Sequence, residues 1–251
     1  MRTLPVENLE SNTESDPLTV DGLLRRRAWQ RPGAVALIDP PNLASLGLGA
    51  PRALTYRELD AAVDRMAAFF AGLGLMPGDI VAAQLPNLSI SPLTLLAAWR
   101  AGLTVATLPL LWREREIGMA CEAVSPKALI GVARFDGDPN AERLCAAAAA
   151  QLSVRFVLGF GGDLPDGAVS LDDVIEADGP EFRSAAVSDM ERGPAVINFT
   201  ARAGQPFVPV VRREDELLAQ GAMTVLALAL DRRDVILNPY PLTGPIDLRL
   251  G

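Results

Sequence analysis

The sequence predicts an α/β fold in which layers rich in parallel strands carry helices on both faces of the sheet. Short apolar runs alternate with amphipathic helical patterns along most of the chain, which is the pattern of successive β-α-β units. Of the 251 residues, 49% are hydrophobic and 22% are charged, a balance that supports a packed core. No repeat of fixed period is visible, so a solenoid is disfavoured.

The N-terminal elements follow from local signals. Residues 1–16 are polar, and we expect them to form a mobile segment that precedes one domain over 17–251. A helix is predicted from Thr19 to just before Pro32, because Thr is a good N-cap and Pro-Gly stops a helix. A strand over 34–38 and a Pro- and Gly-rich loop over 40–51 come next.

The segment Thr55–Glu58 has the clearest signal, a capping box in which the two side chains satisfy exposed helix-start amides. The apolar residues after it recur at helical spacing as far as the glycines 72 and 74, where the helix is predicted to end. These apolar residues are Leu59, Ala62, Val63, Met66, Phe69, Phe70 and Leu73. A buried strand is predicted over 80–84.

The alternation then continues to the end of the chain. Helices are predicted over 89–102, 113–124 and 138–152, and strands over 104–108, 128–132 and 154–159. After a loop-rich stretch with a short amphipathic piece at 171–175, the predicted elements are a strand over 194–200, a helix over about 213–230 and a strand over 234–238.

Composition excludes several classes of function. Lys and Arg total 23 against 31 Asp and Glu, a net charge of −8, which argues against a nucleic-acid partner. The chain has no histidine, so it holds no histidine triad, histidine zinc ligand or histidine general base. The two cysteines, Cys121 and Cys145, lie in apolar helical patterns and are interpreted as small buried hydrophobes in a reduced, cytoplasmic setting.

No membrane span or metal site is predicted. The N-terminus lacks the apolar run of a signal peptide, and the most apolar stretch, 94–111, is interrupted by Arg100. Asp172, Asp173 and Glu176 are interpreted as a solvated helix start, where carboxylates favour the helix dipole. The glycines of segment 159–163 are interpreted as an ordinary turn, and Arg25–Arg27 as a solvated helix face.

Three further segments carry a family resemblance. The first, Leu54–Leu59, reads L-T-Y-R-E-L; the second is L-P-N at 85–87 with A-A-W-R-A-G at 97–102 and P-L at 109–110; the third, Phe199–Phe207, reads F-T-A-R-A-G-Q-P-F. In this order they resemble the L-T-Y-x-E-L, L-P-N…A-x-x-R-A-G and T-S-G-T-T-G-x-P-K motifs of the adenylate-forming superfamily of acyl-CoA synthetases, adenylation domains and luciferases. The resemblance covers about residues 18–242.

The resemblance implies the first part of the large N-terminal domain of an acyl-CoA synthetase-like ligase, truncated at 251. Such enzymes use ATP and Mg²⁺ to convert a carboxylic acid into an acyl-adenylate, and usually pass the acyl group to CoA or another thiol. The motifs that bind adenine and ribose and supply the catalytic lysine would lie beyond Gly251, so no catalytic residue is assigned here.

The candidate phosphate-binding residues are Thr200, Ala201, Arg202, Ala203 and Gly204, but the motif is degenerate. Ala201 stands for a glycine and Phe207 for the lysine, and only one hydroxyl of the motif remains. Each lost hydrogen bond to a charged group removes about 1.5–3 kcal/mol of binding energy. Arg202 either supplies a phosphate-binding charge or points into solvent, and the second reading is favoured because most of the anion-binding apparatus is missing.

Three functional hypotheses remain open. The chain is a split half of a ligase, a non-catalytic binding or regulatory module descended from one, or a piece of a divergent active enzyme. The acyl substrate and the thiol acceptor cannot be derived from these residues. Because an open sheet cut midway exposes apolar surface, we also expect association with a C-terminal half or with a second copy.

Overall fold

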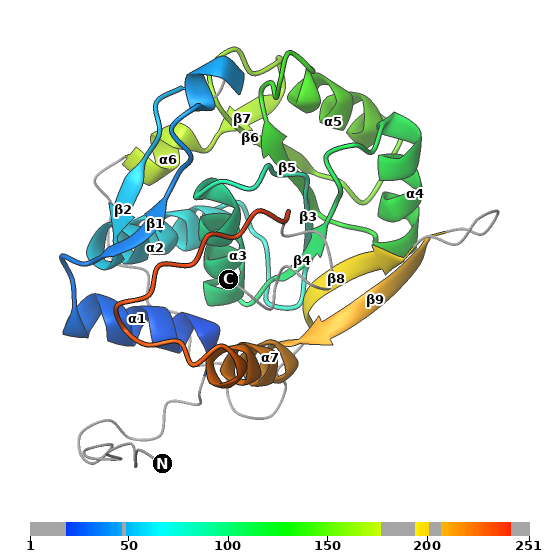
Figure 1. Ribbon diagram of the computed structural model, residues 1–251. Coiled ribbons are helices and arrows are strands. Elements are labelled where there is room, and N and C mark those ends of the chain that lie inside the picture. The colour runs from blue at the N-terminus through cyan, green and yellow to red at the C-terminus, as the bar shows by residue number, and fades with distance from the viewer. Residues whose placement is uncertain (1–18, 47–48, 177–193, 201–206, 242–251) are drawn as a thin grey trace.

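The computed structural model describes residues 19–46, 49–176, 194–200 and 207–241. The predicted mobile segment 1–16 lies outside these ranges. A seven-stranded sheet forms the centre, and a two-stranded sheet lies beside it (Figure 1). Helices cover both faces of the larger sheet, which confirms the predicted fold class.

The larger sheet has the strand order β7-β6-β5-β3-β4-β8-β9. All neighbouring strands are parallel except β9, which pairs antiparallel with β8 at one edge. The strands are β3 (Ile80–Ala83), β4 (Thr104–Thr107), β5 (Ala128–Val132), β6 (Phe156–Phe160), β7 (Ala168–Ser170), β8 (Pro194–Thr200) and β9 (Val208–Arg213).

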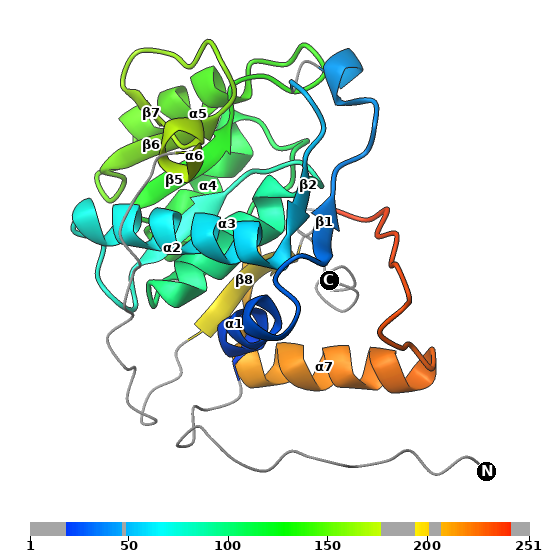
Figure 2. The same ribbon diagram turned by 90° about the vertical axis from the view of Figure 1, so that its left-hand side faces the viewer.

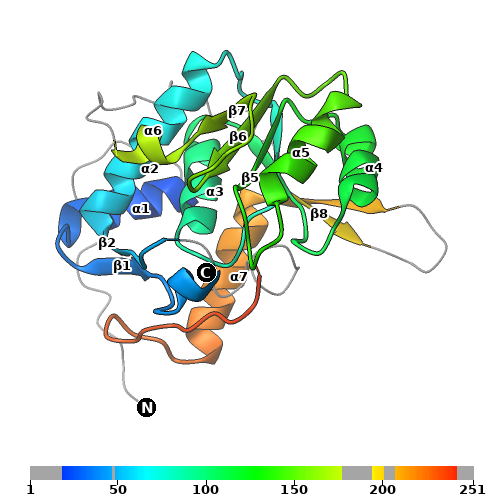
Figure 3. The same cartoon turned by 90° about the horizontal axis from the view of Figure 1, so that it is seen from above.

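The helical layers lie on opposite sides of this sheet (Figure 3). One layer comprises α1 (Val20–Gln30), α2 (Tyr56–Gly72), α3 (Ile90–Arg100) and the short α6 (Asp172–Glu176), and the other comprises α4 (Glu114–Val124) and α5 (Asn140–Ala149). Alternation along β3 sends Val81 and Ala83 into the first core and Ala82 into the second. Each buried strand therefore serves both cores.

The capping box that begins α2 is confirmed. Thr55 Oγ1 accepts a hydrogen bond from the Glu58 amide at 3.3 Å, and Glu58 Oε2 accepts one from the Thr55 amide at 2.8 Å. The two-stranded sheet, β1 (Val35–Ile38) with β2 (Ala53–Thr55), leads directly into this cap. A 3₁₀ turn, Leu43–Leu46, lies in the loop between them. The start of α2 is therefore at a position fixed by backbone pairing.

Arg100 joins three helices of the first layer. Its side chain has no exposed surface, and its guanidinium donates to Asp21 at 2.7 Å, Asp60 at 2.6 Å and Asp64 at 2.8 Å. Burial alone would lower the pKa of Arg100, but the hydrogen bonds and charges of Asp21 and Asp60 outweigh it, so its pKa is raised. The arginine that interrupts the apolar stretch 94–111 is thus a buried ion-pair centre.

Some predicted elements were wrong or missed. Residues 234–238 form no strand, because no neighbouring segment of the described chain supplies a hydrogen-bonding ladder. The strands β2, β7 and β9 were not predicted: β2 and β7 are only three residues long, and β9 is an edge strand that contains Pro209, which cannot donate to a ladder. The last helix, α7 (Glu214–Ala227), ends three residues earlier than predicted, and Figure 2 shows it beside α1, with its C-terminal end extending away from the sheet.

None of the helices that the structure describes is long and apolar enough to cross a membrane.

Candidate functional site

The candidate phosphate loop connects β8 to β9 at one edge of the main sheet. Because β8 runs parallel to β4, it ends at the same edge as the other parallel strands, where ligands of open α/β sheets bind. Thr200 is the last residue of β8; it is exposed, and its hydroxyl donates to the Val208 carbonyl at 3.4 Å across the hairpin. Ala201, Arg202, Ala203 and Gly204 lie outside the described residues.

An aromatic cluster holds the base of this hairpin. The rings of Trp112 and Phe207 are stacked with centroids 4.3 Å apart and planes 19° apart, and Phe199 packs on Trp112 in a tilted arrangement at 5.4 Å. Trp112 follows β4, where its amide donates to the Pro109 carbonyl at 3.0 Å. The residue to which the resemblance assigns the lysine position is thus an uncharged ring packed on the exit of β4.

Side-chain hydrogen bonds fix β8 on its neighbours. Asn198 Nδ2 donates to Thr107 Oγ1 at 2.9 Å, and Thr104 Oγ1 donates to the Pro194 carbonyl at 2.6 Å. Trp99 Nε1 on α3 donates to the Ala195 carbonyl at 2.8 Å. The strand that leads into the candidate loop is therefore anchored along its length, which is the support that a positioned loop requires.

Another conventional ligand position, the point where the strand order reverses between β3 and β5, is filled. Gln84 follows β3 and is fully buried; its Nε2 donates to the carbonyls of Pro109 and Trp112 at 2.7 and 3.1 Å. Its Oε1 accepts from Asn140 Nδ2 at 2.6 Å, and Asn140 Oδ1 accepts from the Val132 amide at 3.0 Å. The hydrogen bonds of this network occupy the side-chain polar groups of Gln84 and Asn140 at the point where the strand order reverses.

The arginines nearest to Trp112 are already paired. Arg113 and Arg143 both form ion pairs with Asp138, and Arg143 also donates to the Trp112 carbonyl at 3.3 Å. Burial would raise the pKa of Asp138, but the hydrogen bonds of Arg143 and Arg113 outweigh it and hold that pKa below its ordinary value. These two cations are therefore committed to a carboxylate within the protein.

The cysteines are not activated nucleophiles. Cys121 on α4 is buried, and burial raises the pKa of its thiol to about 11. Burial also raises the pKa of Cys145 on α5, which is half-buried. A nucleophilic cysteine needs a lowered pKa, so both thiols are protonated at neutral pH, in line with their interpretation as small hydrophobes.

The described residues around the hairpin do not by themselves fit a magnesium–triphosphate group. They offer the Thr200 hydroxyl, and the cations near Trp112 are paired. Within the described ranges no three His, Cys, Asp or Glu side chains gather closely enough to hold a metal ion. We therefore assign no step of a reaction to Mg²⁺ in this chain.

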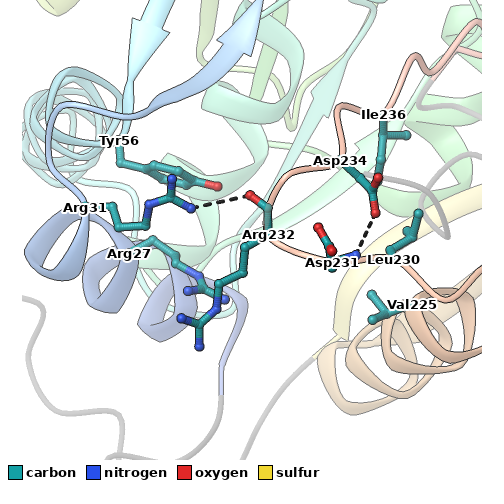
Figure 4. A pocket seen from close by; sticks show the side chains of 9 residues that line it. All are labelled: Arg27, Arg31, Tyr56, Val225, Leu230, Asp231, Arg232, Asp234 and Ile236. Carbon is teal, nitrogen blue, oxygen red and sulfur yellow. Dashed lines mark hydrogen bonds between the residues drawn. The ribbon is translucent and has the colours of Figure 1, made fainter. Parts of the chain in front are cut away.

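A cavity that the sequence did not predict lies between α1 and the segment after α7 (Figure 4). Its volume is about 310 Å³. One wall is polar and cationic, and the Arg31 guanidinium there donates to the Arg232 carbonyl at 3.5 Å. The lining residues are Arg27, Arg31, Tyr56, Val225, Leu230, Asp231, Arg232, Asp234 and Ile236. No local motif pointed to this cavity, because the Arg31–Arg232 contact across it joins residues 201 positions apart in sequence.

The fold and the position of the hairpin define an open α/β domain with a loop at the ligand-binding edge of its sheet. The chain belongs to the AMP-binding enzyme family, whose pattern matches residues 24–201. The match includes the first two sequence motifs and β8.

Curated relatives support this assignment. The salicyl-AMP ligase / salicyl-S-ArCP synthetase of Mycobacterium tuberculosis is 37% identical over 132 residues, which is 51% of this chain and 22% of that protein. The 2-hydroxy-7-methoxy-5-methyl-1-naphthoate–CoA ligase of Streptomyces carzinostaticus is 29% identical over 238 residues, 88% of this chain and 40% of that protein. The chain therefore spans less than half the length of these relatives.

Solved structures share the fold. The apo structure of MbtA from Mycobacterium smegmatis superposes with a TM-score of 0.74 at 26% identity, over 91% of this chain and 40% of that chain. Acetoacetyl-CoA synthetase from Streptomyces lividans gives a TM-score of 0.78 at 20% identity, over 93% of this chain and 37% of that chain. At 20% identity the second likeness concerns the fold alone.

Proposed function

We propose that this chain is the N-terminal portion of an adenylate-forming acid–thiol ligase and is inactive without the rest of the fold. In the reaction, a carboxylate oxygen attacks the α-phosphorus of ATP, and pyrophosphate leaves. A thiol, that of CoA or of a carrier, then attacks the acyl carbon of the mixed anhydride, and AMP leaves. The match of the family pattern over residues 24–201, at the sheet edge where β8 ends, is the observation that carries this proposal.

An aromatic acid is the substrate class that we propose first. One relative, 37% identical over 51% of this chain, is named for a salicyl group, and another, which matches 88% of this chain, is named for a hydroxynaphthoate group. The long-chain-fatty-acid–CoA ligase of Yersinia pestis matches a shorter part, 103 residues at 31% identity. A soluble, cytoplasmic ligase acting on a hydroxyaryl acid is the form of the proposal to be tested.

The test is ATP–pyrophosphate exchange with salicylate or a long-chain fatty acid as the acid. The chain alone should show no exchange. A chimera joins residues 1–241 of this chain to the part of the Streptomyces carzinostaticus ligase that follows its matched region. This chimera should exchange pyrophosphate with the aryl acid in preference to the fatty acid, and the intact Streptomyces ligase is the positive control. A folded but inactive chimera, with an active control, would overturn the proposal.

The second candidate is a non-catalytic module, which the stacking of Phe207 on Trp112 favours. A chimera with the loop restored by Ala201→Gly, Arg202→Thr, Ala203→Thr and Phe207→Lys separates the two. If only the restored loop supports exchange, the natural loop has lost its phosphate site and the non-catalytic reading is correct. If the natural loop is active and Arg202→Ala weakens calorimetric Mg-ATP binding at least tenfold, Arg202 supplies the missing charge.

A further inference from the structure

The cavity between α1 and the segment after α7 has a cationic wall. Arg27 and Arg31 reach it from the C-terminal end of α1, and Arg232 reaches it from the turn that follows α7 (Figure 4). The Arg31 guanidinium donates to the Arg232 carbonyl at 3.5 Å, so the two segments meet at this wall. Three guanidinium groups from distant parts of the sequence therefore face one space.

These three arginines have hydrogen-bond donors to spare. Within the part of the chain that the structure describes, none of them forms an ion pair, and each guanidinium carries five N–H donors. Arg27 donates to Gln30 Oε1 at 3.4 Å, a long contact like that of Arg31. Arg25 on the same helix is by contrast paired with two aspartates. Because unpaired cations that share a cavity repel one another, an anion placed between them removes an electrostatic cost.

The two aspartates of the cavity do not neutralise this wall. Asp231 Oδ1 accepts from the Arg233 amide at 2.7 Å, and Asp234 Oδ2 accepts from the Asp231 amide at 2.6 Å. Both carboxylates therefore hold the turn in which they lie. Three arginines against two aspartates leave the lining with a net charge of +1, which favours a monoanion over a phosphate dianion or a triphosphate.

The opposite side of the cavity is apolar. Val225, Leu230 and Ile236 line it, and Figure 4 shows them across from the guanidinium groups. Tyr56 adds an aromatic ring and a hydroxyl that has no hydrogen bond to the described residues. The volume of about 310 Å³ lies at the lower end of the range for small-molecule sites, about 300–1,000 Å³. The cavity therefore combines room for a small apolar body with a cationic end.

We propose that this cavity binds a small amphipathic carboxylate, an acid with one ionised carboxyl group on a compact apolar body. The planar guanidinium groups of Arg27, Arg31 and Arg232 match a carboxylate because each can donate two parallel N–H···O bonds. The body of the acid lies against the apolar side. The lining residues come from α1, the start of α2 and positions 225–236, so the site differs from the candidate phosphate loop at the end of β8. The proposal goes beyond the proposed function and does not depend on it.

Calorimetric titration of the full chain with benzoate tests this proposal. Benzamide is the neutral analogue of the same shape, and inorganic phosphate is the alternative anion. Benzoate should bind saturably, and the other two should bind at least tenfold more weakly. Benzamide lacks the charge that the arginines recognise, and phosphate meets the two aspartates with a greater negative charge.

Substitutions of single arginines locate the binding. The double variant Arg27→Gln, Arg31→Gln should weaken benzoate binding at least tenfold, and Arg232→Gln, outside the helix, should weaken it independently. Arg26→Gln is the matched control, because Arg26 belongs to α1 but does not line the cavity, and it should leave the affinity unchanged. Circular dichroism checks that each variant is folded.

Every other result counts against the proposal. No saturable binding of benzoate overturns it, as does binding that the double variant and Arg232→Gln leave unchanged. Equal affinity for benzamide would identify an apolar cavity without an anion site, and tighter binding of phosphate would refute the carboxylate class. The titrations contain neither ATP nor pyrophosphate, so their outcome is independent of whether the chain takes part in adenylation.

Discussion

Two aspartates that face arginines have pKa shifts of opposite sign. Burial raises the pKa of Asp64 on α2 because it disfavours the ionised form, and this outweighs the attraction of Arg100 and Arg25. Asp138 is more accessible, and its hydrogen bonds with Arg143 and Arg113 lower its pKa despite burial. The surroundings of each carboxyl group, rather than the presence of an arginine, therefore decide the direction of its shift.

The two carboxyl groups should give the free energy of unfolding opposite pH dependences. A raised pKa in the folded state gives stability that is present below the ordinary pKa of 3.8 and is lost as the pH rises through the folded value, which is the case of Asp64. A lowered pKa gives stability that is present above 3.8 and is lost as the pH falls through the folded value, which is the case of Asp138.

Urea unfolding between pH 3 and 7 of the natural chain, Asp64→Asn and Asp138→Asn measures this. Relative to Asp64→Asn, the natural chain should lose stability as the pH rises. Relative to Asp138→Asn, it should gain stability. Parallel curves for all three proteins would show that neither carboxyl group titrates differently in the folded and unfolded states.

At the level of single elements, local chemistry decided where α2 begins. The lack of tertiary pairing decided that the predicted strand over 234–238 does not form. The Thr55–Glu58 cap needs only residues three apart, so it forms wherever this helix forms. The segment 234–238 needs a partner strand, and none is present among the described residues. The β8–β9 hairpin combines both kinds of interaction. Its two strands are neighbours in the sequence, but its base packs through the stack of Phe207 on Trp112, a residue that is distant in the sequence.

Removal of the cap should have a defined cost. Thr55→Ala removes the acceptor for the Glu58 amide and should lower the free energy of unfolding by about 1 kcal/mol. Thr55→Ser keeps the hydroxyl and serves as the matched control, with a change of a few tenths of a kcal/mol expected on the scale of such caps. Chemical denaturation of the three proteins at pH 7 makes the comparison. Equal losses for alanine and serine would mean that the threonine acts through its methyl group in β2 and not as a cap.

At the scale of the whole molecule, Arg100 links the first helical layer. It reaches α1 through Asp21 and α2 through Asp60 and Asp64, while α3 itself packs on β4. The residue occupies the arginine position of the A-x-x-R-A-G resemblance, where the sequence alone offered no role for it. In the structure it is the buried centre of a charge network.

Loss of this centre should destabilise the entire domain. Arg100→Met leaves three carboxylates around an uncharged side chain and should cost about 3–5 kcal/mol, because breaking a buried pair strands its partners. Arg25→Met removes a partly exposed arginine next to two of the same carboxylates and should cost about 0–1 kcal/mol. Thermal and urea unfolding of both variants gives the comparison. A loss for Arg100→Met no greater than that for Arg25→Met would remove Arg100 from this role.

Much of the fold could be predicted from the sequence because its signals are local. The apolar runs of β3, β4, β5 and β8 and the helical periodicity of α2 follow from residues close together in the chain, and their bounds agree with the structure to within a few residues. Thr200 ends β8, in agreement with the predicted strand over 194–200, and its role in phosphate binding stays a prediction. The motif order that indicated the AMP-binding family is likewise a property of the linear sequence.

Contacts between distant segments decided the rest. The strand order, the antiparallel edge strand β9 and the partners of Arg100 depend on which segments meet in space. Trp112 was missed as a partner of the loop because its contact with Phe207 spans 95 positions, and the Gln84–Asn140 hydrogen bond spans 56. The sequence by itself determined the family, the helix starts and the buried strands, since these need only short-range periodicity and capping. Only the tertiary structure determined that the lysine position is packed on a tryptophan and that Arg27, Arg31 and Arg232 line one cavity, because packing and exposure are properties of the assembled chain.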